Sequence, residues 1–297
     1  MRYIVSTILL LLSGTTFSQL VSDTGRFAFC GSNRVLIAHI KEPGDTIPSI
    51  VWEWRADQAT DLPEAYRRTY FNNIDECKPV HGNEDLLVTA STGGVALIHI
   101  KTKAVGFLTL LPQAHSAELL PGNRIVVASS TDAKGNSLQV FDARLNSRVL
   151  YRDSMYAAHG VVWDAARNQL YAVGGDELRI YRLANWQTDT PLLVKTASYT
   201  LPEKSGHDLQ YMPGNNQLLF TTQHGVWVFD IATAAITPYK ELANSVDVKS
   251  VSFSRTTHRL LFVQSEESWW AYHLRLLHPA VHLSYPSIHI YKARWFH

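Results

Sequence analysis

The sequence predicts an all-β protein, a six-bladed β-propeller with four-stranded blades, and three observations carry this prediction. One β-rich segment recurs in five copies that begin at residues 75, 115, 159, 207 and 249, in steps of 40, 44, 48 and 42 residues. The segments are short and rich in β-branched and aromatic residues, which favours strands over helices. Fragments at both ends of the chain complete one further copy. Propeller blades of four strands have this length.

Each copy begins with a polar residue on a short strand, followed by a turn of the Pro-Gly-Asn type and further β-rich runs. In the second copy these parts are His115-Ser-Ala-Glu-Leu-Leu, Pro121-Gly-Asn, Ile125-Val-Val-Ala and Leu138-Gln-Val-Phe-Asp. Aspartates after or near the strands are expected to serve the turns. They are Asp142, Asp164 and Asp230.

The two ends of the chain complete the sixth blade. Phe27-Ala-Phe-Cys, Val35-Leu-Ile-Ala-His and Ile50-Val-Trp-Glu-Trp resemble second, third and fourth strands, and Ile290-Tyr-Lys-Ala-Arg-Trp resembles a first strand. We place Lys292, which follows Lys249 by 43 residues, at the first repeat position. This closure removes the exposed sheet edges. Seven blades are the alternative if residues 268–285 hold another repeat.

The N-terminus predicts export. A positive start, a short apolar run from Ile4 to Leu12 and small residues before Gln19 indicate a signal peptide over residues 1–18. The run is too short for a membrane anchor, and no later segment is long enough to span a bilayer. Residues 19–297 then form a single periplasmic or extracellular domain, which we expect to be a monomer. The net charge of +1 does not favour a nucleic-acid partner.

The two cysteines, Cys30 and Cys77, fall on predicted strands of neighbouring blades. In an oxidising compartment they could form a disulfide. The alternative is that both are small buried apolar residues.

The first repeat positions carry most of the candidate chemistry. The innermost strand of each blade starts near one face of the channel, so these positions should form a ring. The predicted ring contains Asp75, His115, His159, His207, Lys249 and Lys292. Three imidazoles suit a divalent metal such as Zn, Mn or Ca, with open positions for substrate. The alternative is a polar lining that contacts only water and neighbouring main chain.

The lysines of the ring suggest an anionic substrate. We expect Asp75, Lys249 and Lys292 to be catalytic, with further polar side chains binding substrate. The predicted substrate-binding residues are Arg67, Arg68, Tyr70, Lys78, Glu118 and Gln210. The long segment from Ala56 to Asn73 supplies three of them and either serves the site or covers a sheet edge.

These features lead to two functional hypotheses. The first is an exported carbohydrate-active enzyme, a metal-assisted lyase on a uronate-containing glycan, because β-elimination needs a neutralised carboxylate and a general base. The second is a propeller without catalytic activity that binds a glycan or a protein on the same face.

Two resemblances accompany this interpretation. The motifs His115-Ser-Ala-Glu-Leu-Leu-Pro, Gly206-His-Asp-Leu-Gln and Tyr291-Lys-Ala-Arg-Trp resemble an uncharacterised family of exported Bacteroidota propellers, which implies the fold and the export route. The chain is more loosely similar to oligogalacturonate lyases, whose metal is held by three His and a Gln. That resemblance implies His115, His159, His207 and either Gln210 or Gln223 as ligands. Those lyases have seven blades and a longer chain.

Overall fold

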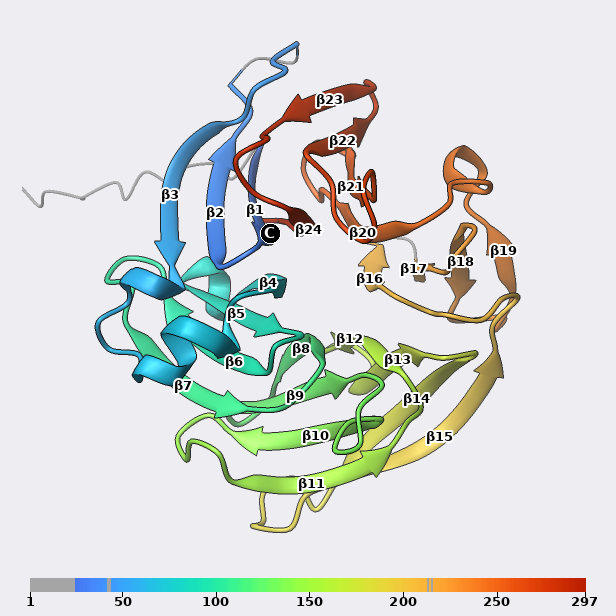
Figure 1. Ribbon diagram of the computed structural model, residues 1–297. Helices are drawn as coiled ribbons and strands as arrows, with labels where there is room; N and C mark the ends of the chain where they lie inside the picture. Colours follow the sequence, from blue (N-terminus) through green and yellow to red (C-terminus); the bar gives the residue numbers. More distant parts are fainter. Residues whose placement is uncertain (1–24, 42–43, 213, 215) are drawn as a thin grey trace, which may run out of the picture.

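The protein is a closed ring of six four-stranded antiparallel sheets, as Figure 1 shows for the computed structural model. The structure describes residues 25–41, 44–212, 214 and 216–297. The predicted six-bladed propeller is confirmed, and the seven-bladed alternative is wrong because residues 268–285 belong to the outer half of the last blade. The predicted signal peptide, residues 1–18, lies outside the described residues.

The blades follow one another in chain order, and the strands of each blade run from innermost to outermost in the order named. The first blade is β24 (Ile290–Trp295), β1 (Arg26–Gly31), β2 (Arg34–His39) and β3 (Ser49–Arg55). The second is β4 (Ile74–Val80), β5 (Asp85–Ala90), β6 (Gly94–His99) and β7 (Val105–Leu110). The third is β8 (Ala114–Leu120), β9 (Arg124–Ser129), β10 (Ser137–Asp142) and β11 (Val149–Ser154).

The other three blades have the same order. The fourth is β12 (Ala158–Asp164), β13 (Gln169–Gly174), β14 (Glu177–Ala184) and β15 (Leu192–Thr200). The fifth is β16 (Leu209–Met212), β17 (Gln217–Thr221), β18 (Val226–Asp230) and β19 (Ile236–Pro238). The sixth is β20 (Val248–Phe253), β21 (Leu260–Gln264), β22 (His273–Leu277) and β23 (Val281–Ser284).

The ring closes through the C-terminal strand. β24 pairs antiparallel with β1, with Phe27 opposite Trp295 and Cys30 opposite Lys292. The last strand of the chain is therefore the innermost strand of the blade that contains the first, as predicted. This pairing satisfies the backbone groups of both strands and leaves no open edge between them.

The apolar core lies between the blades rather than along the axis. Six clusters of buried apolar side chains occupy the six interfaces between neighbouring blades. Phe107 of β7, for example, packs edge-on against Phe141 of β10 in the neighbouring blade, with ring centroids 6.0 Å apart. Because the apolar side chains are used between blades, the axis is left to polar residues.

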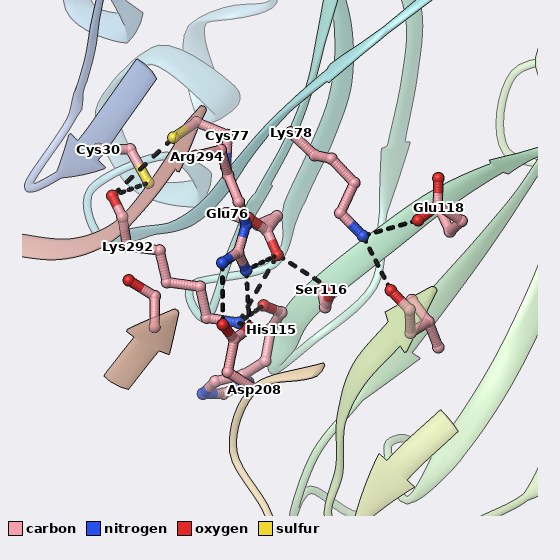
Figure 2. Close-up of polar contacts among 12 residues, drawn as sticks. Cys30, Glu76, Cys77, Lys78, His115, Ser116, Glu118, Asp208, Lys292 and Arg294 are labelled. Atoms are coloured by element: carbon pink, nitrogen blue, oxygen red, sulfur yellow. Dashed lines mark hydrogen bonds and ion pairs between the residues drawn. The ribbon is translucent and has the colours of Figure 1, made fainter. Parts of the chain in front are cut away.

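Cys30 and Cys77 lie in the interface between the first two blades, as expected from their strands. Both are fully buried free thiols, and both sulfurs contact the carbonyl oxygen of Lys292, at 3.8 and 4.0 Å (Figure 2). Burial raises the pKa of the Cys30 thiol. Of the two alternatives, the structure shows the buried thiols.

The turns between first and second strands need backbone that only a few residue types adopt easily. The last turn residue has a positive φ, as in Asn123 (57°) and Asn168 (54°). Asparagine tolerates this left-handed region. Asp164 accepts hydrogen bonds from the N–H groups of Ala166 and Arg167, and Asp142 and Asp230 make equivalent bonds. The structural role predicted for these aspartates is confirmed.

The segment between β3 and β4 holds two short helices, η1 (Ala56–Gln58) and η2 (Tyr66–Tyr70), and two more lie elsewhere, η3 (His81–Asn83) and η4 (Lys240–Leu242). Figure 1 shows η1 and η2 lying over the second blade. Phe71 anchors the segment, because it is buried in the interface between the first two blades and contacts Trp54 edge-on at 5.8 Å. In the described part of the chain, no helix is long and apolar enough to cross a membrane.

Candidate functional site

A bulge on the innermost strands creates the polar mouth of the channel. In four innermost strands, the pairing register with the neighbouring strand shifts at the second residue of the strand. These residues are Asp75 in β4, His115 in β8, His159 in β12 and Lys249 in β20. A bulge inserts one unpaired residue and redirects its side chain. His207 precedes Asp208, which pairs with Thr221 through its backbone, and it holds the same place in the fifth blade.

Tyr291, not Lys292, completes this ring. The shift between β1 and β24 leaves Tyr291 as the unpaired residue, while Lys292 pairs with Cys30. The register predicted for Lys292 was therefore wrong by one residue, and such a slip exchanges the two sides of a strand. The ring rests on six residues, which we call the mouth: Asp75, His115, His159, His207, Lys249 and Tyr291.

The three histidines of the mouth lie side by side. The ring centroids of His115 and His159 are 4.2 Å apart, and those of His159 and His207 are 5.0 Å apart. Nδ1 of His115 donates to the carbonyl oxygen of Gln113 at 2.8 Å, and Nδ1 of His159 donates to that of Ala157 at 2.9 Å. These bonds fix the proton on Nδ1, so the Nε2 lone pairs of both rings face away from the main chain.

The imidazoles of the mouth are held uncharged. Burial lowers the pKa of His115 and of His159 well below the usual value, and the neighbouring imidazoles, Lys292 and Lys249 add to the effect. Burial and Lys249 lower the pKa of His207 to about 3. Neutral imidazole is the form that binds metals and accepts protons.

Asp75 has the opposite shift. Burial raises the pKa of its carboxyl group to about 7, although hydrogen bonds from Ser91 and the charge of Lys292 oppose the rise. The side-chain amide of Asn73 donates to the carboxyl group at 3.2 Å, and the backbone N–H of Ser91 also donates to it. A carboxyl group that titrates near neutral pH can act as an acid or a base.

The two lysines predicted as catalytic are engaged by acidic groups. Nζ of Lys249 lies 3.2 Å from Asp247. Nζ of Lys292 donates to the carbonyl oxygen of His115 at 3.1 Å and pairs with Asp208 at 3.2 Å and Glu76 at 3.7 Å. With three acceptors around a buried ammonium, Lys292 is placed to hold the channel together rather than to contact a substrate.

Below the mouth, four buried charged residues close the channel, and we call them the plug: Glu76, Asp208, Lys292 and Arg294. Figure 2 shows the Arg294 guanidinium between the two carboxylates, with four N–O distances of 2.7 to 2.8 Å. Burial opposes ionisation of Glu76 and Asp208, but Arg294 and Lys292 outweigh it and keep the pKa of both below the usual range. The plug is formally neutral.

Beyond the plug, a third polar layer surrounds the far end of the channel. Lys78, Glu118 and Gln210 each lie three residues after the mouth residue of their blade, at the position of Arg294 in the first blade. Three strand residues span about 10 Å. Gln210, predicted as a fourth ligand beside the histidines, is therefore on the far side of the plug. Gln223, the other candidate, donates to Asp247 at 2.8 Å.

The remaining predicted binding residues lie on the segment between β3 and β4. Arg68 pairs with Glu64 at 2.9 Å, and both side chains are well exposed. Tyr70 packs edge-on against Tyr66 with centroids 5.1 Å apart, and the half-buried Arg67 lies on the same helix. The ion pair and the aromatic contact both stay within the segment and do not reach the mouth.

The mouth can be tested for its fit to a metal ion. Across the described ranges, no three His, Cys, Asp or Glu side chains already converge as a ligand set. Three imidazoles on a tetrahedral ion with metal–nitrogen bonds of about 2.1 Å would have centroids roughly 5 Å apart, close to the separations of 4.2 and 5.0 Å. Nδ1 of His207 is buried without a hydrogen-bond partner. The separations of these two neighbouring pairs and the unpaired nitrogen fit an imidazole-bound ion, and a shift of the side chains would be needed for all three to reach it.

Sequence reasoning missed Glu76, Tyr291 and Arg294. An alignment of the innermost strands could have revealed the first two of them. It places Asp75-Glu76, His207-Asp208 and Tyr291-Lys292 at the same two positions of three blades. The pairing of Glu76 with Arg294 joins residues 218 positions apart, which local patterns do not reveal.

The fold and channel define a closed six-bladed propeller with a charged plug and a histidine-lined mouth. Residues 33–297 match a family of unknown function (DUF6528), and the chain belongs to that family. A search of curated proteins gives no match. The chain is similar in fold to one in the "Crystal Structure of Mitotic Checkpoint Complex", with TM-score 0.55, 14% identity, and coverage of 84% of this chain and 71% of that chain.

Proposed function

We propose that the mouth binds an acidic glycan through a divalent metal ion, and that the protein is an exported carbohydrate-active propeller. The observation that carries the proposal is the set of uncharged imidazoles on consecutive blades, two of them with Nδ1 bound to main-chain carbonyls. Histidines that ligate metals typically donate their other N–H in this way. Imidazole favours Zn or Mn, whereas Ca prefers oxygen ligands.

A cavity beside the histidines supports a ligand of sugar size. It has a volume of about 410 Å³, and its lining includes His159, His207, Ser130 and Lys204. This volume lies in the range of small-molecule sites. Lys204 adds a cation beside the imidazoles, which suits a carboxylate-bearing sugar.

An aromatic cluster on the loop between β21 and β22 also favours a carbohydrate. Trp269 is 51% exposed and packs edge-on against Trp270, which stacks on His289 with centroids 4.6 Å apart. Ala271 pairs with Ile290, the residue before Tyr291, so this cluster adjoins the mouth. Exposed aromatic rings offer an apolar face to the C–H groups of a pyranose.

The first activity to test is β-elimination from a uronate. A base removes the proton on the carbon that bears the carboxylate, the C–H electron pair becomes a C=C bond, and the glycosidic C–O bond breaks with protonation of the leaving oxygen. A bound metal ion would neutralise the carboxylate. Asp75 is the candidate for the proton transfers, because its pKa is raised to about 7. Lys249 and Lys292 are less suited, since both are paired with acidic groups.

Elemental analysis and an absorbance assay test this proposal. Purified protein should contain about one equivalent of Zn or Mn, and polygalacturonate should give a rise in ultraviolet absorbance from the new double bond. His159→Ala should abolish both, and His282→Ala, on the outermost strand β23, should change neither. Wild-type protein without metal after reconstitution with Zn and Mn, or activity retained in His159→Ala, would contradict the proposal.

A second candidate function is glycan binding without catalysis. The pairing of Lys249 with Asp247, and of Lys292 with Asp208 and Glu76, favours it. With the imidazoles bound to the metal ion, Asp75 is then the one mouth residue left to act as a base. Metal and oligogalacturonate binding that both depend on His159, without any rise in absorbance, would select this alternative.

A further inference from the structure

The far end of the channel forms a second recess, separated from the mouth by the plug. Its volume is about 410 Å³, within the range of small-molecule sites. The six residues that lie three positions after a mouth residue all line it: Lys78, Glu118, Val162, Gln210, Ser252 and the plug residue Arg294. Trp163 and Tyr211, each one residue further along its strand, form aromatic walls. Every blade therefore contributes one residue of this set to the recess, and Val162 is the apolar member.

The acidic side chains of this recess are already paired with cations, so little uncompensated negative charge is left to repel an anionic ligand. Arg294 has both carboxylates of the plug as partners, and Lys78 pairs with Glu118 at 2.9 Å. Asp164 at the rim pairs with Arg167 at 2.7 Å. Each acidic side chain that lines the recess therefore has its own cation.

Several donors remain without an acceptor. Nε2 of Gln210 is buried and has no hydrogen-bond partner. Nζ of Lys78 donates to Glu118 and to the carbonyl oxygen of Val161, which uses two of its three N–H groups. Arg255, on the turn after β20, lines the recess as an additional exposed cation.

An excess of donors requires a ligand that supplies acceptors. A buried amide N–H without a partner is destabilising, and a carboxylate oxygen would satisfy it with a strong, charge-assisted bond. Arg255 offers a planar fork that suits the same group. Trp163 and Tyr211 would cover the apolar part of such a molecule.

We infer that this recess is a second ligand site, which binds a small organic carboxylate up to the size of a monosaccharide acid. Gln210 and Arg255 hold the carboxylate, and the aromatic pair packs against the carbon skeleton. The site is independent of the histidines, since the plug lies between them.

Calorimetric titration with D-galacturonate tests the inference, and D-galactose, which lacks the carboxylate, is the matched ligand control. The protein should be treated with a chelator so that binding at the mouth does not contribute. We expect one equivalent of galacturonate to bind and galactose to bind at least 10-fold more weakly. Arg255→Gln and Gln210→Met should each weaken galacturonate binding at least 10-fold, whereas His159→Ala and the exposed-site control Arg148→Gln should leave it unchanged.

Three results would overturn the inference: no binding of galacturonate at 10 mM, equal binding of both sugars, or affinity unchanged in both recess variants. Arg255 is exposed, so Arg255→Gln should fold normally even if Gln210→Met does not. Binding lost only in His159→Ala would assign the sugar acid to the mouth and not to this recess. Failure of the proposed metal site would show in elemental analysis and leave this titration unaffected.

Discussion

The mouth and the plug are adjacent layers of one channel, yet the titratable groups of the mouth are mostly neutral and those of the plug are charged. Three plug residues, Glu76, Asp208 and Lys292, directly follow a mouth residue on the inner strands. In the mouth, His115, His159 and His207 are neutral because burial and nearby cations disfavour their charged forms. In the plug, Glu76 and Asp208 stay ionised at even deeper burial because Arg294 and Lys292 face them. Among these buried groups, the charge of the neighbouring side chains decides which form is stable. The plug therefore serves the fold, while the mouth keeps lone pairs available for chemistry.

The largest expected effect is that of removing the cation at the centre of the plug. Arg294→Met leaves two buried carboxylates with only Lys292 between them, and breaking a buried ion pair costs about 3–5 kcal/mol. The free energy of unfolding in urea, followed by tryptophan fluorescence, should fall by this amount. Arg294→Lys, which keeps the charge, should lose less. Equal losses in both variants would mean that packing rather than charge holds the plug.

The free energy of unfolding should fall at acidic pH because the unfolded state gains protons at positions such as His207 of the mouth. The pKa of His207 is about 3 in the folded protein and about 6.5 when unfolded, so its stabilising contribution is present above pH 6.5 and is lost as the pH falls. Linkage gives a loss of about 2 kcal/mol between pH 7 and pH 5 for such a group. In urea titrations at these two pH values, His207→Gln should reduce the loss by about this amount. A variant with the wild-type difference would contradict the assignment of a neutral His207.

Asp75 should change the pH dependence of the free energy of unfolding in the direction opposite to His207, and by a smaller amount. Its pKa is raised to about 7, so its contribution is fully present below the unfolded value of about 3.9 and is lost as the pH rises through 7. Asp75→Asn keeps an acceptor for Ser91 and removes the ionisation. The variant should gain about 1–2 kcal/mol relative to wild type between pH 6 and pH 8. An unchanged or reversed pH dependence would show that Asp75 is ionised at neutral pH.

The smallest effect is expected at the surface. Arg144 pairs with Asp142 at 2.7 Å, as Arg294 pairs with Asp208, but its side chain is 67% exposed. Exposed pairs contribute about 0–1 kcal/mol. Arg144→Met should therefore leave the free energy of unfolding close to the wild-type value under the conditions used for Arg294→Met. If Arg144→Met loses as much stability as Arg294→Met, burial does not explain why the Arg294–Asp208 pair differs from the Arg144–Asp142 pair.

Much of the candidate site follows from the repeat alone. Five of the six mouth residues, from Asp75 to Lys249, are predicted because each begins the first strand of a copy. The residue equivalent to Lys249 in the first blade is Tyr291, 42 residues further on, and not Lys292, 43 residues further on. The other repeats differ in length by several residues, so the sequence is compatible with either position. Only the pairing of β24 with β1 distinguishes Tyr291 from Lys292 at this position.

Periodic patterns along the chain predict the all-β propeller, its closure by the C-terminal strand and the alignment of the three histidines, and they favour six blades over seven. The tertiary structure decided which channel residues pair with one another, that a plug separates two recesses, and that Lys78, Glu118 and Gln210 lie away from the histidines. The physical reason is that bulges reorient single residues, and that ion pairs such as Glu76 with Arg294 form between strands far apart in sequence. Local sequence patterns reveal neither the bulges nor these long-range ion pairs.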